Sequence, residues 1–223
     1  MAARFIALIS PIIEHNFSKY IALKKAFYLT ALEKVNGDYL EFGVFTGGAL
    51  VFSTRVNRKL SWISGKMTTN FFGFDSFEGF GSAASHDDHP FYTDDTFAVN
   101  FQKVERNIKK QTKGSNVRLI KGFFNDTLID HSPESYGISK ARVIFIDCDL
   151  MEPALLALRF CAPLLQEGTI LLLDDYFSYK GNSKLGISGA FMKFKNEHPE
   201  IEWRRLYGYG YLGQAFICTF PNS

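Results

Sequence analysis

ILLLDDY at residues 170–176 is the stretch that decides the fold, together with IFIDCD at 144–149 and LEFGVFTGG at 40–48. Each is a short apolar run that contains or meets an acidic residue. Such runs are typical of strands whose two faces are both covered by helices. An acid at the end of a buried strand lies at the carboxyl edge of the sheet, where open α/β sheets bind their ligands. We therefore expect the ligand site of this protein at that edge.

Three acids from two of these stretches, Asp147, Asp174 and Asp175, are predicted to meet at one point of the edge. Carboxylates that cluster beside a buried sheet repel one another unless a positive charge lies between them, and a divalent cation such as Mg²⁺ prefers oxygen ligands. An Asp after a strand is also common as a helix cap. Two adjacent acids at a buried edge are harder to explain as caps, because unpaired buried charge is unfavourable. Asp149 is a competing ligand.

Strands and helices alternate along the chain. The apolar patterns predict strands at 39–44, 71–75, 117–121, 143–147, 169–173, 201–207 and 212–220, and helices within 3–35 and at 47–60, 97–112, 125–131, 152–167 and 186–196. This order predicts an α/β fold, a Rossmann-like doubly wound and mostly parallel sheet with helices on both faces. The two closing strands predict one antiparallel strand, because a tight turn joins only antiparallel strands.

The chain divides into two parts by pattern. Residues 1–36 are expected to form N-terminal helices that contact an acceptor or another subunit, and residues 37–223 the main domain. Within that domain, the polar segment 79–96 has no periodicity of its own, and we expect a mobile lid or binding loop there.

Composition excludes several classes of function. The formal net charge is +2, and the Lys and Arg residues are scattered rather than gathered in a basic stripe, so a nucleic-acid partner is not expected. No run approaches the length of a membrane span. The three cysteines, all in apolar segments, are expected to be reduced and buried. The start of the chain lacks a signal-peptide cleavage site, and a cytoplasmic enzyme is the expectation.

The loop after the first strand favours a ligand without phosphates. A dinucleotide-binding loop needs a glycine where this chain has Phe45, so that the backbone can approach a pyrophosphate. The helix that begins at Gly47 still offers free N–H groups to a carboxylate. Asp75, at the end of the next strand, is placed to accept hydrogen bonds from ribose hydroxyls. Carboxylate, sulfonium and adenosine together describe S-adenosylmethionine, although the loop alone is equally compatible with a simple strand–helix turn.

Five blocks in fixed order carry a family resemblance: LEFGVFTGGAL, GFDSFEGF, VRLIKGFFNDTL, VIFIDCDL and ILLLDDYFSYKG. They resemble the macrocin O-methyltransferase family, class I enzymes that use S-adenosylmethionine and a divalent metal to methylate sugar hydroxyls of natural products. The resemblance runs from about Gly37 to Gly189. It implies a seven-stranded sheet with an antiparallel last strand, a small hydroxylated acceptor and a homo-oligomer.

The resemblance also implies roles for individual residues. Glu41, Gly43, Phe45, Thr46 and Gly47 would surround the methionine part of the donor, Asp75 and Ser76 would contact its ribose, and Gly122, Phe123 and Asp126 would lie near its adenine. Asp147, Asp174 and Asp175 take the metal-ligand positions, and Asp147 is also expected beside the donor and in catalysis.

The general base is expected among the histidines. His86 and His89 lie in the 79–96 loop, and imidazole accepts a proton near neutral pH, although a loop histidine is often just a solvated side chain. His131 is a third candidate of the same kind. His15 and His198 are interpreted as surface residues.

Two alternative functions stay open at this point. One is a nicotinamide-dependent oxidoreductase on a similar fold, which Phe45 and the missing third glycine disfavour. The other is a non-catalytic domain that binds S-adenosylmethionine, which the intact acids at the strand ends disfavour.

Overall fold

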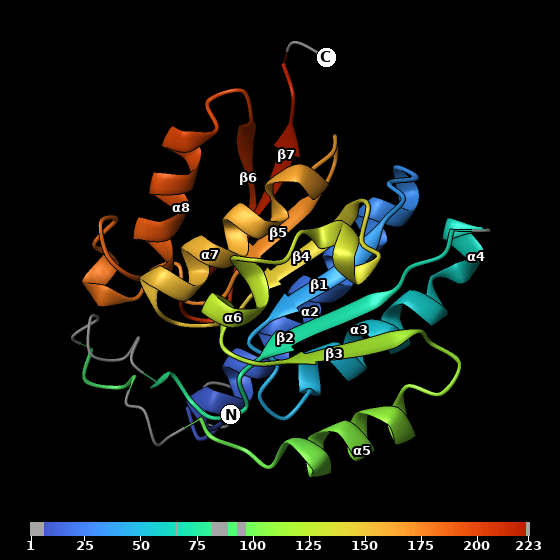
Figure 1. Ribbon diagram of the computed structural model, residues 1–223, viewed down its shortest axis with the longest axis horizontal. Coiled ribbons are helices and arrows are strands. Elements are labelled where there is room, and N and C mark those ends of the chain that lie inside the picture. Colours follow the sequence, from blue (N-terminus) through green and yellow to red (C-terminus); the bar gives the residue numbers. More distant parts are fainter. Residues whose placement is uncertain (1–6, 66, 82–88, 93–96, 222–223) are drawn as a thin grey trace.

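The computed structural model describes residues 7–65, 67–81, 89–92 and 97–221. A seven-stranded sheet runs through its centre in the order β3-β2-β1-β4-β5-β7-β6 (Figure 1). The strands are β1 (Asp38–Phe42), β2 (Phe71–Asp75), β3 (Val117–Lys121), β4 (Ala141–Ile146), β5 (Ile170–Leu173), β6 (Glu202–Tyr209) and β7 (Gly213–Thr219). Strand β7 is antiparallel to both of its neighbours, β5 and β6. The predicted Rossmann-like sheet with an antiparallel last strand is confirmed.

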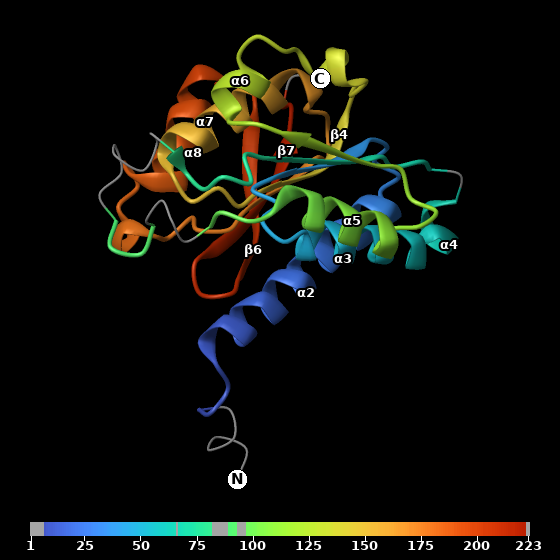
Figure 2. The same cartoon turned by 60° about the horizontal axis from the view of Figure 1, so that its bottom comes forward.

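Helices cover both faces of the sheet (Figure 2). They are α2 (Pro11–Leu32), α3 (Gly48–Lys59), α4 (Ser61–Ser64), α5 (Phe101–Gln111), α6 (Phe124–Leu128), α7 (Met151–Cys161) and α8 (Gly186–Glu197), with short 3-10 turns η3 (Pro133–Tyr136), η4 (Ala162–Leu164) and η5 (Tyr179–Gly181). One apolar core joins α2, α3 and α5 to the sheet, and another joins α6, α7 and α8 to its other face. None of the described helices is long and apolar enough to cross a bilayer.

The register of the central strands brings the acids together. Strands β1, β4 and β5 are buried along their whole length, as the apolar residues that dominate these stretches predict. Ile146 of β4 pairs with Leu173 of β5, so that Asp147 and Asp174 follow side by side at the carboxyl edge. The N–H of Asp174 donates to the carbonyl of Ile146 at 3.0 Å, which continues the ladder one step beyond the strands.

Two helix boundaries differ from the prediction for local reasons. The helix expected from residue 97 begins at Phe101, because the Asn100 side chain accepts a hydrogen bond from the Lys103 N–H and caps the helix there. The helix expected to run to residue 167 ends at Cys161 and continues only as a 3-10 turn. Pro163 lies in that turn, and proline lacks the N–H that an α-helix needs.

A buried arginine fastens the C-terminal half of α2 to the sheet. Arg142 of β4 is fully buried and donates from Nε to the Thr30 hydroxyl at 2.7 Å and from Nη2 to the Phe27 carbonyl at 2.9 Å. Its Nη1 donates to Asn57 and Thr69. Burial lowers the pKa of Arg142 to about 10, so the guanidinium remains charged at neutral pH. This network and the buried residues around Phe27 set the position of α2.

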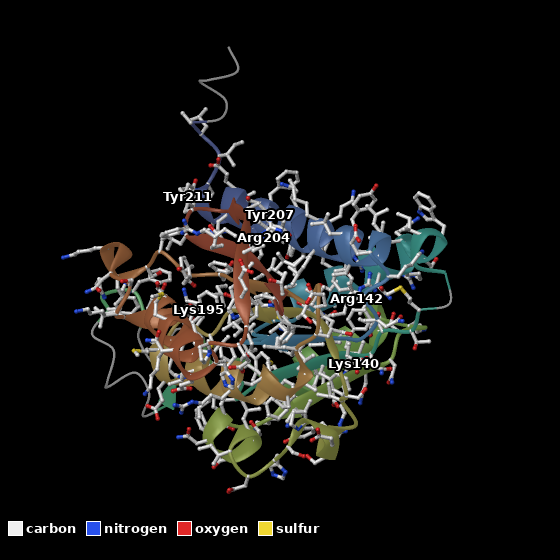
Figure 3. The ribbon with its side chains drawn as sticks, turned by 90° about the horizontal axis from the view of Figure 1, so that it is seen from above. Lys140, Arg142, Lys195, Arg204, Tyr207 and Tyr211 are labelled. Atoms are coloured by element: carbon white, nitrogen blue, oxygen red, sulfur yellow. The ribbon has the colours of Figure 1, made fainter. Side chains whose placement is uncertain are left out.

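The N-terminal half of α2 also makes polar contacts to β6 and to the turn between β6 and β7, seen beside α2 in Figure 3. The Tyr211 hydroxyl donates to Glu14 at 2.7 Å, the Gly210 N–H donates to the Ser18 hydroxyl at 2.7 Å, and the Tyr207 hydroxyl donates to the Ala22 carbonyl. The helix therefore reaches the carboxyl edge of the sheet with a fixed orientation.

Candidate active site

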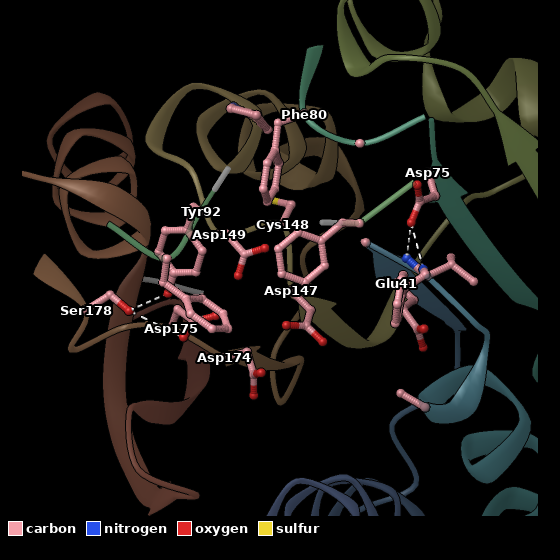
Figure 4. Close-up of a pocket in the computed structure, with 18 of the residues that line it drawn as sticks. Glu41, Asp75, Phe80, Tyr92, Asp147, Cys148, Asp149, Asp174, Asp175 and Ser178 are labelled. Atoms are coloured by element: carbon pink, nitrogen blue, oxygen red, sulfur yellow. Dashed lines mark hydrogen bonds between the residues drawn. The ribbon is translucent and has the colours of Figure 1, made fainter. Parts of the chain in front are cut away.

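A cavity of about 1380 Å³ opens at the carboxyl edge of the sheet. Its lining comes from the ends of β1, β2, β4 and β5, from α2, from the start of α6 and α7, and from the segments around Phe80 and Tyr92. Figure 4 shows Glu41 and Asp75 at one end, Tyr92 and Ser178 at the other, and Asp147 between them. The ligand site predicted at this edge is therefore present as a cavity.

Asp75 organises the loop that follows β1. Its Oδ2 accepts hydrogen bonds from the N–H groups of Val44 and Phe45, each at 2.7 Å, and its Oδ1 accepts one from the N–H of Phe77 at 2.6 Å. Burial raises the pKa of Asp75, while these three N–H groups lower it and hold the carboxylate in place. Gly43 has a φ of 92°, and a Cβ there would lie 1.9 Å from the Asp147 carbonyl oxygen, so only glycine lets β1 approach β4 this closely.

Glu41 is a buried carboxyl group with one free oxygen. Its side chain is 1% exposed, and its Oε2 accepts a hydrogen bond from the Tyr39 hydroxyl. Its Oε1 has no hydrogen-bond partner of good geometry among the described residues. Burial raises the pKa of Glu41 to about 8, although Tyr39 and Lys19 lower it. A buried carboxyl group with an unpaired oxygen is stabilised most by a positively charged hydrogen-bond donor, such as an ammonium group, placed in the cavity.

The acid cluster is wider than predicted. One carboxylate oxygen from each of Asp147, Asp149 and Asp175 lies within 4.8 Å of the others. Burial and the neighbouring acids raise the pKa of Asp147 and of Asp149 well above the usual range. Asp149 itself has a φ of 63°, an uncommon conformation for a residue other than glycine. The cluster therefore has the oxygen atoms, and the need for positive charge, that are typical of a site for a hard divalent cation.

Lys19 of α2 neutralises part of this cluster. Its ammonium lies 2.6 Å from Asp174 Oδ2 and 2.9 Å from Asp147 Oδ2, and its side chain is only 12% exposed. Burial alone would lower the pKa of Lys19, but Asp147 and Asp174 outweigh burial and raise it. The side chain is therefore charged. His15, one helical turn earlier, lies 3.2 Å from the same Asp174 oxygen.

The interpretation of His15 as a surface residue is wrong, and Lys19 is absent from the predicted site. Both residues lie on the inward face of α2, because positions 15, 19, 22, 26 and 30 follow one another at helical spacing and the last three are buried. That periodicity is the signal in the sequence that finds them. His198, in contrast, lies beside Glu200 at the surface, as expected.

The pKa of Asp174 is lowered, whereas the pKa values of Asp147 and Asp149 are raised. Burial would raise the pKa of Asp174, but Lys19 and His15 together lower it to about 2. Its second oxygen, Oδ1, is buried and has no hydrogen-bond partner among the described residues. Asp174 is thus ionised at neutral pH and holds α2 against the edge with one oxygen, while the other faces no donor.

The histidine candidates have different positions. His89 lines the cavity and stacks on Tyr92 with ring centroids 4.1 Å apart. Its Nδ1 accepts a hydrogen bond from the Phe91 N–H at 3.2 Å, which leaves Nε2 as the protonated nitrogen of a neutral ring. His131 lies beside Tyr136 and is not among the residues that line the cavity. His86 lies outside the described residues.

Most of the predicted donor-binding residues line the cavity. They are Glu41, Gly43, Phe45, Thr46, Asp75, Ser76, Phe123, Asp126 and Asp147. Gly47 and Gly122 do not line it. Gly47 instead precedes α3 in a left-handed conformation, and Gly122 has a φ of 150° in the turn after β3. These two glycines shape the turns that carry the lining residues.

Comparison with known protein families gives a match over most of this chain. A sequence model of the family described as Macrocin-O-methyltransferase (TylF) matches residues 18–202. The 8-demethyl-8-(2,3-dimethoxy-alpha-L-rhamnosyl)-tetracenomycin-C 4'-O-methyltransferase of Streptomyces olivaceus is 29% identical over 150 residues. That match covers 64% of this chain and 54% of the relative, so this chain spans little more than half of that protein.

Solved structures show the same fold at low identity. The O-methyltransferase NovP has a TM-score of 0.71 and 20% identity, over 90% of this chain and 79% of its own. Apo CalS11, a TDP-rhamnose 3'-O-methyltransferase, has a TM-score of 0.59 and 20% identity, over 91% of this chain and 80% of its own.

The sheet order and the edge cavity thus define the class, a Rossmann-like fold of the kind found in O-methyltransferases. Because the family model matches most of the sequence, the chain belongs to the macrocin-O-methyltransferase family. The family expected from the sequence is confirmed.

We expect Lys19→Met to lower the free energy of unfolding by about 3 kcal/mol at pH 7, because it leaves the buried Asp174 and the half-buried Asp147 without their counter-charge. Lys19→Arg should keep most of the stability. The difference in the free energy of unfolding between Lys19→Met and wild type should shrink as the pH falls toward 2. The stability that comes from the lowered pKa of Asp174 is lost when Asp174 is protonated. Urea denaturation measures both effects. Lys24→Met, at an exposed position of α2, is the control, and an equal loss in the two variants would contradict the assignment.

Proposed function

We propose that the protein is an S-adenosylmethionine-dependent, divalent-cation-assisted O-methyltransferase that acts on a hydroxyl group of a sugar or glycosylated natural product. The observation that carries the proposal is one cavity with two chemically different acidic parts. Glu41 has an unpartnered buried oxygen at one end, and the cluster of Asp147, Asp149 and Asp175 lies in the middle. The curated relative named above acts on a rhamnosyl group, which supports the acceptor class.

The donor end fits S-adenosylmethionine. The free Oε1 of Glu41 suits the ammonium group of the methionine part, and the start of α3 suits its carboxylate. Phe45, with a φ of 50°, occupies the place where a pyrophosphate would need a glycine. Asp75 and Ser76 line the cavity for the ribose, and Phe123 and Asp126 line it for the adenine, with Gly122 shaping the turn.

The acid cluster fits Mg²⁺ or a similar cation. Asp147 and Asp175 belong both to the set predicted from the sequence and to the set that lies together here, whereas Asp174 uses one oxygen for Lys19 and offers only Oδ1. Asp149 completes the cluster in space. A bound divalent cation would lower the pKa of an acceptor hydroxyl and stabilise the alkoxide that forms from it.

The protein residues supply orientation and a proton acceptor. Methyl transfer breaks the bond between the methyl carbon and sulfur and forms a bond to the acceptor oxygen, so donor and acceptor must be held in line. Burial and neighbouring acids raise the pKa of Asp149, which suits its carboxylate to take the hydroxyl proton. His89, whose Nδ1 is occupied, presents Nε2–H as a hydrogen-bond donor to the acceptor. His86 stays a candidate base on sequence grounds.

Calorimetry tests this proposal. We expect the chain to bind S-adenosylhomocysteine but not NAD, and to bind Mg²⁺ at a single site. Asp175→Asn should weaken Mg²⁺ binding by at least about 100-fold, because removing even an outer-shell partner of a metal typically weakens binding by 10–100-fold. Asp130→Asn, an exposed acid outside the cavity, is the matched control. Binding of NAD in place of S-adenosylhomocysteine would refute the proposal.

Asp149→Asn separates the two roles of that residue. If Asp149 is mainly the proton acceptor, the variant should bind Mg²⁺ normally but turn over slowly. If it is mainly a ligand, Mg²⁺ affinity should fall together with turnover. Direct measurement of Mg²⁺ binding and of single-turnover methyl transfer distinguishes these outcomes.

We also propose that α2 pairs with α2 of a second copy of this chain. Ile13, Phe17, Ile21, Tyr28 and Leu32 are exposed along the face of α2 that points away from the sheet. Four of them are placed symmetrically along the helix, so antiparallel pairing would place Ile13 against Leu32 and Phe17 against Tyr28, with Ile21 near the crossing point. A two-fold interface requires this kind of self-complementary pattern.

Sedimentation velocity tests the pairing. At micromolar concentrations we expect a dimer, and Phe17→Glu should convert it to a monomer, because the substitution buries a charge at the centre of each contact. Ile129→Glu, which changes another exposed apolar residue outside α2, should leave the dimer intact. A wild-type monomer at all concentrations would rule the pairing out.

A further inference from the structure

Lys19 brings a positive charge of the protein itself into the acid cluster. Its ammonium group lies 2.6 Å from Oδ2 of Asp174 and 2.9 Å from Oδ2 of Asp147. The same group lies 5.7 Å from the centre of the Phe145 ring, and the side chain is only 12% exposed. Any other cation that enters the cluster therefore meets a positive charge that is already bound there.

The position of Lys19 does not depend on the acids alone. Helix α2 is fastened by Arg142, which donates to the Thr30 hydroxyl at 2.7 Å, and by the Tyr207 hydroxyl, which donates to the Ala22 carbonyl at 2.9 Å. Ala22, one turn after Lys19, is 1% exposed. A substitution of Lys19 thus removes its charge while these contacts keep the helix in place.

Asp174 is already occupied by groups of α2. Its Oδ2 lies 2.6 Å from the Lys19 ammonium and 3.2 Å from Nε2 of His15. Its Oδ1 is buried and has no hydrogen-bond partner among the described residues. One of the two oxygens of Asp174 is therefore used to dock α2 rather than to bind a cation.

The other three aspartates form a separate group. A carboxylate oxygen from each of Asp147, Asp149 and Asp175 lies within 4.8 Å of the others, and Figure 4 shows these side chains close to Asp174. Asp174 is not a member of this group among the residues that the structure describes. Asp147 belongs to the group and also contacts Lys19. A cation bound by the group would therefore share the Asp147 carboxylate with the Lys19 ammonium.

The shared carboxylate sets the two positive charges against each other. Like charges a few ångströms apart repel, and the repulsion is stronger where burial lowers the effective dielectric constant. The side chain of Asp147 is 22% exposed and that of Asp174 is 3% exposed, so water screens this part of the cavity poorly. The charge of Lys19 consequently lowers the affinity of the cluster for a second cation.

We propose that Lys19 is a positioning residue that acts against the divalent cation, by keeping Asp174 out of its ligand set and by weakening its binding at Asp147. The inference rests on the proposed function, since it concerns the cation site of that function. When all four aspartates are ionised, the Lys19 ammonium and one divalent cation leave the cluster with a single net negative charge. That charge would lie in the same cavity as the sulfonium of the proposed donor.

Binding of Mn²⁺ to the full chain tests the inference. Carboxylates bind Mn²⁺ as they bind Mg²⁺, and the electron paramagnetic resonance signal of free Mn²⁺ measures binding without any enzyme assay. Lys19→Gln removes the charge but keeps an N–H donor for Asp174, and Lys19→Met removes both. We expect each variant to bind Mn²⁺ about tenfold more tightly than wild type, because the repulsion at Asp147 is gone.

The sign of the change separates this role from a merely structural one. Loss of a structural contact would leave Mn²⁺ binding unchanged or weaken it, whereas loss of a competing charge strengthens it. Lys19→Arg, which keeps the charge, should retain wild-type affinity, and Lys24→Met, at an exposed position of α2, is the control. Equal or weaker binding of Mn²⁺ in Lys19→Gln and Lys19→Met would overturn the inference.

A comparison of two acids tests the ligand set. Asp174→Asn should weaken Mn²⁺ binding at least about tenfold less than Asp175→Asn does, because Asp175 belongs to the three-acid group and Asp174 is held by α2. A loss in Asp174→Asn as large as that in Asp175→Asn would contradict the assignment of Asp174 to α2.

The outcomes distinguish this inference from the proposed function. If wild type binds Mn²⁺ and the Lys19 variants bind it no more tightly, only the role of Lys19 is wrong. If Mn²⁺ binds to the Lys19 variants and not to wild type, the role of Lys19 is supported and the cation-assisted part of the proposed function fails. If Mn²⁺ binds to none of them, both are wrong.

Discussion

The repulsion among four aspartates at the carboxyl edge of the sheet is the constraint on which the rest of the site depends. Asp147, Asp149, Asp174 and Asp175 come from the ends of two buried parallel strands, whose register sets them close together. One ammonium group, from Lys19, lies among them and offsets only part of their charge. The docking of α2 and the need for further positive charge in the cavity both follow from that imbalance.

The central sheet and its acidic edge were predictable because they depend on local patterns. Runs dominated by apolar residues predict β1, β4 and β5, and an acid directly after such a run lies at the edge of the sheet. The contribution of α2 was harder to predict. Lys19 meets Asp147 across 128 positions of sequence, a contact that depends on how Arg142 and the core seat the helix. Only the helical spacing of His15 and Lys19 with the buried Ala22 indicated that they face inward.

The edge is divided among three tasks by the chemistry of its neighbours. Asp75 is held by three backbone N–H groups and shapes the loop of the proposed donor end, and Glu41 keeps one oxygen for a positive group. The aspartates in the middle form the proposed cation site. Tyr92 and the rings around it give the third part an apolar surface.

Paramagnetic relaxation tests the central claim, that donor and cation share one cavity, most directly. The chain would be loaded with Mn²⁺ and with S-adenosylmethionine carrying ¹³C in its transferable methyl group. The account predicts strong broadening of the bound methyl signal, which Asp175→Asn removes, because the cation cluster and the donor end meet at Asp147. A methyl signal that is bound but unaffected by Mn²⁺ would contradict the account.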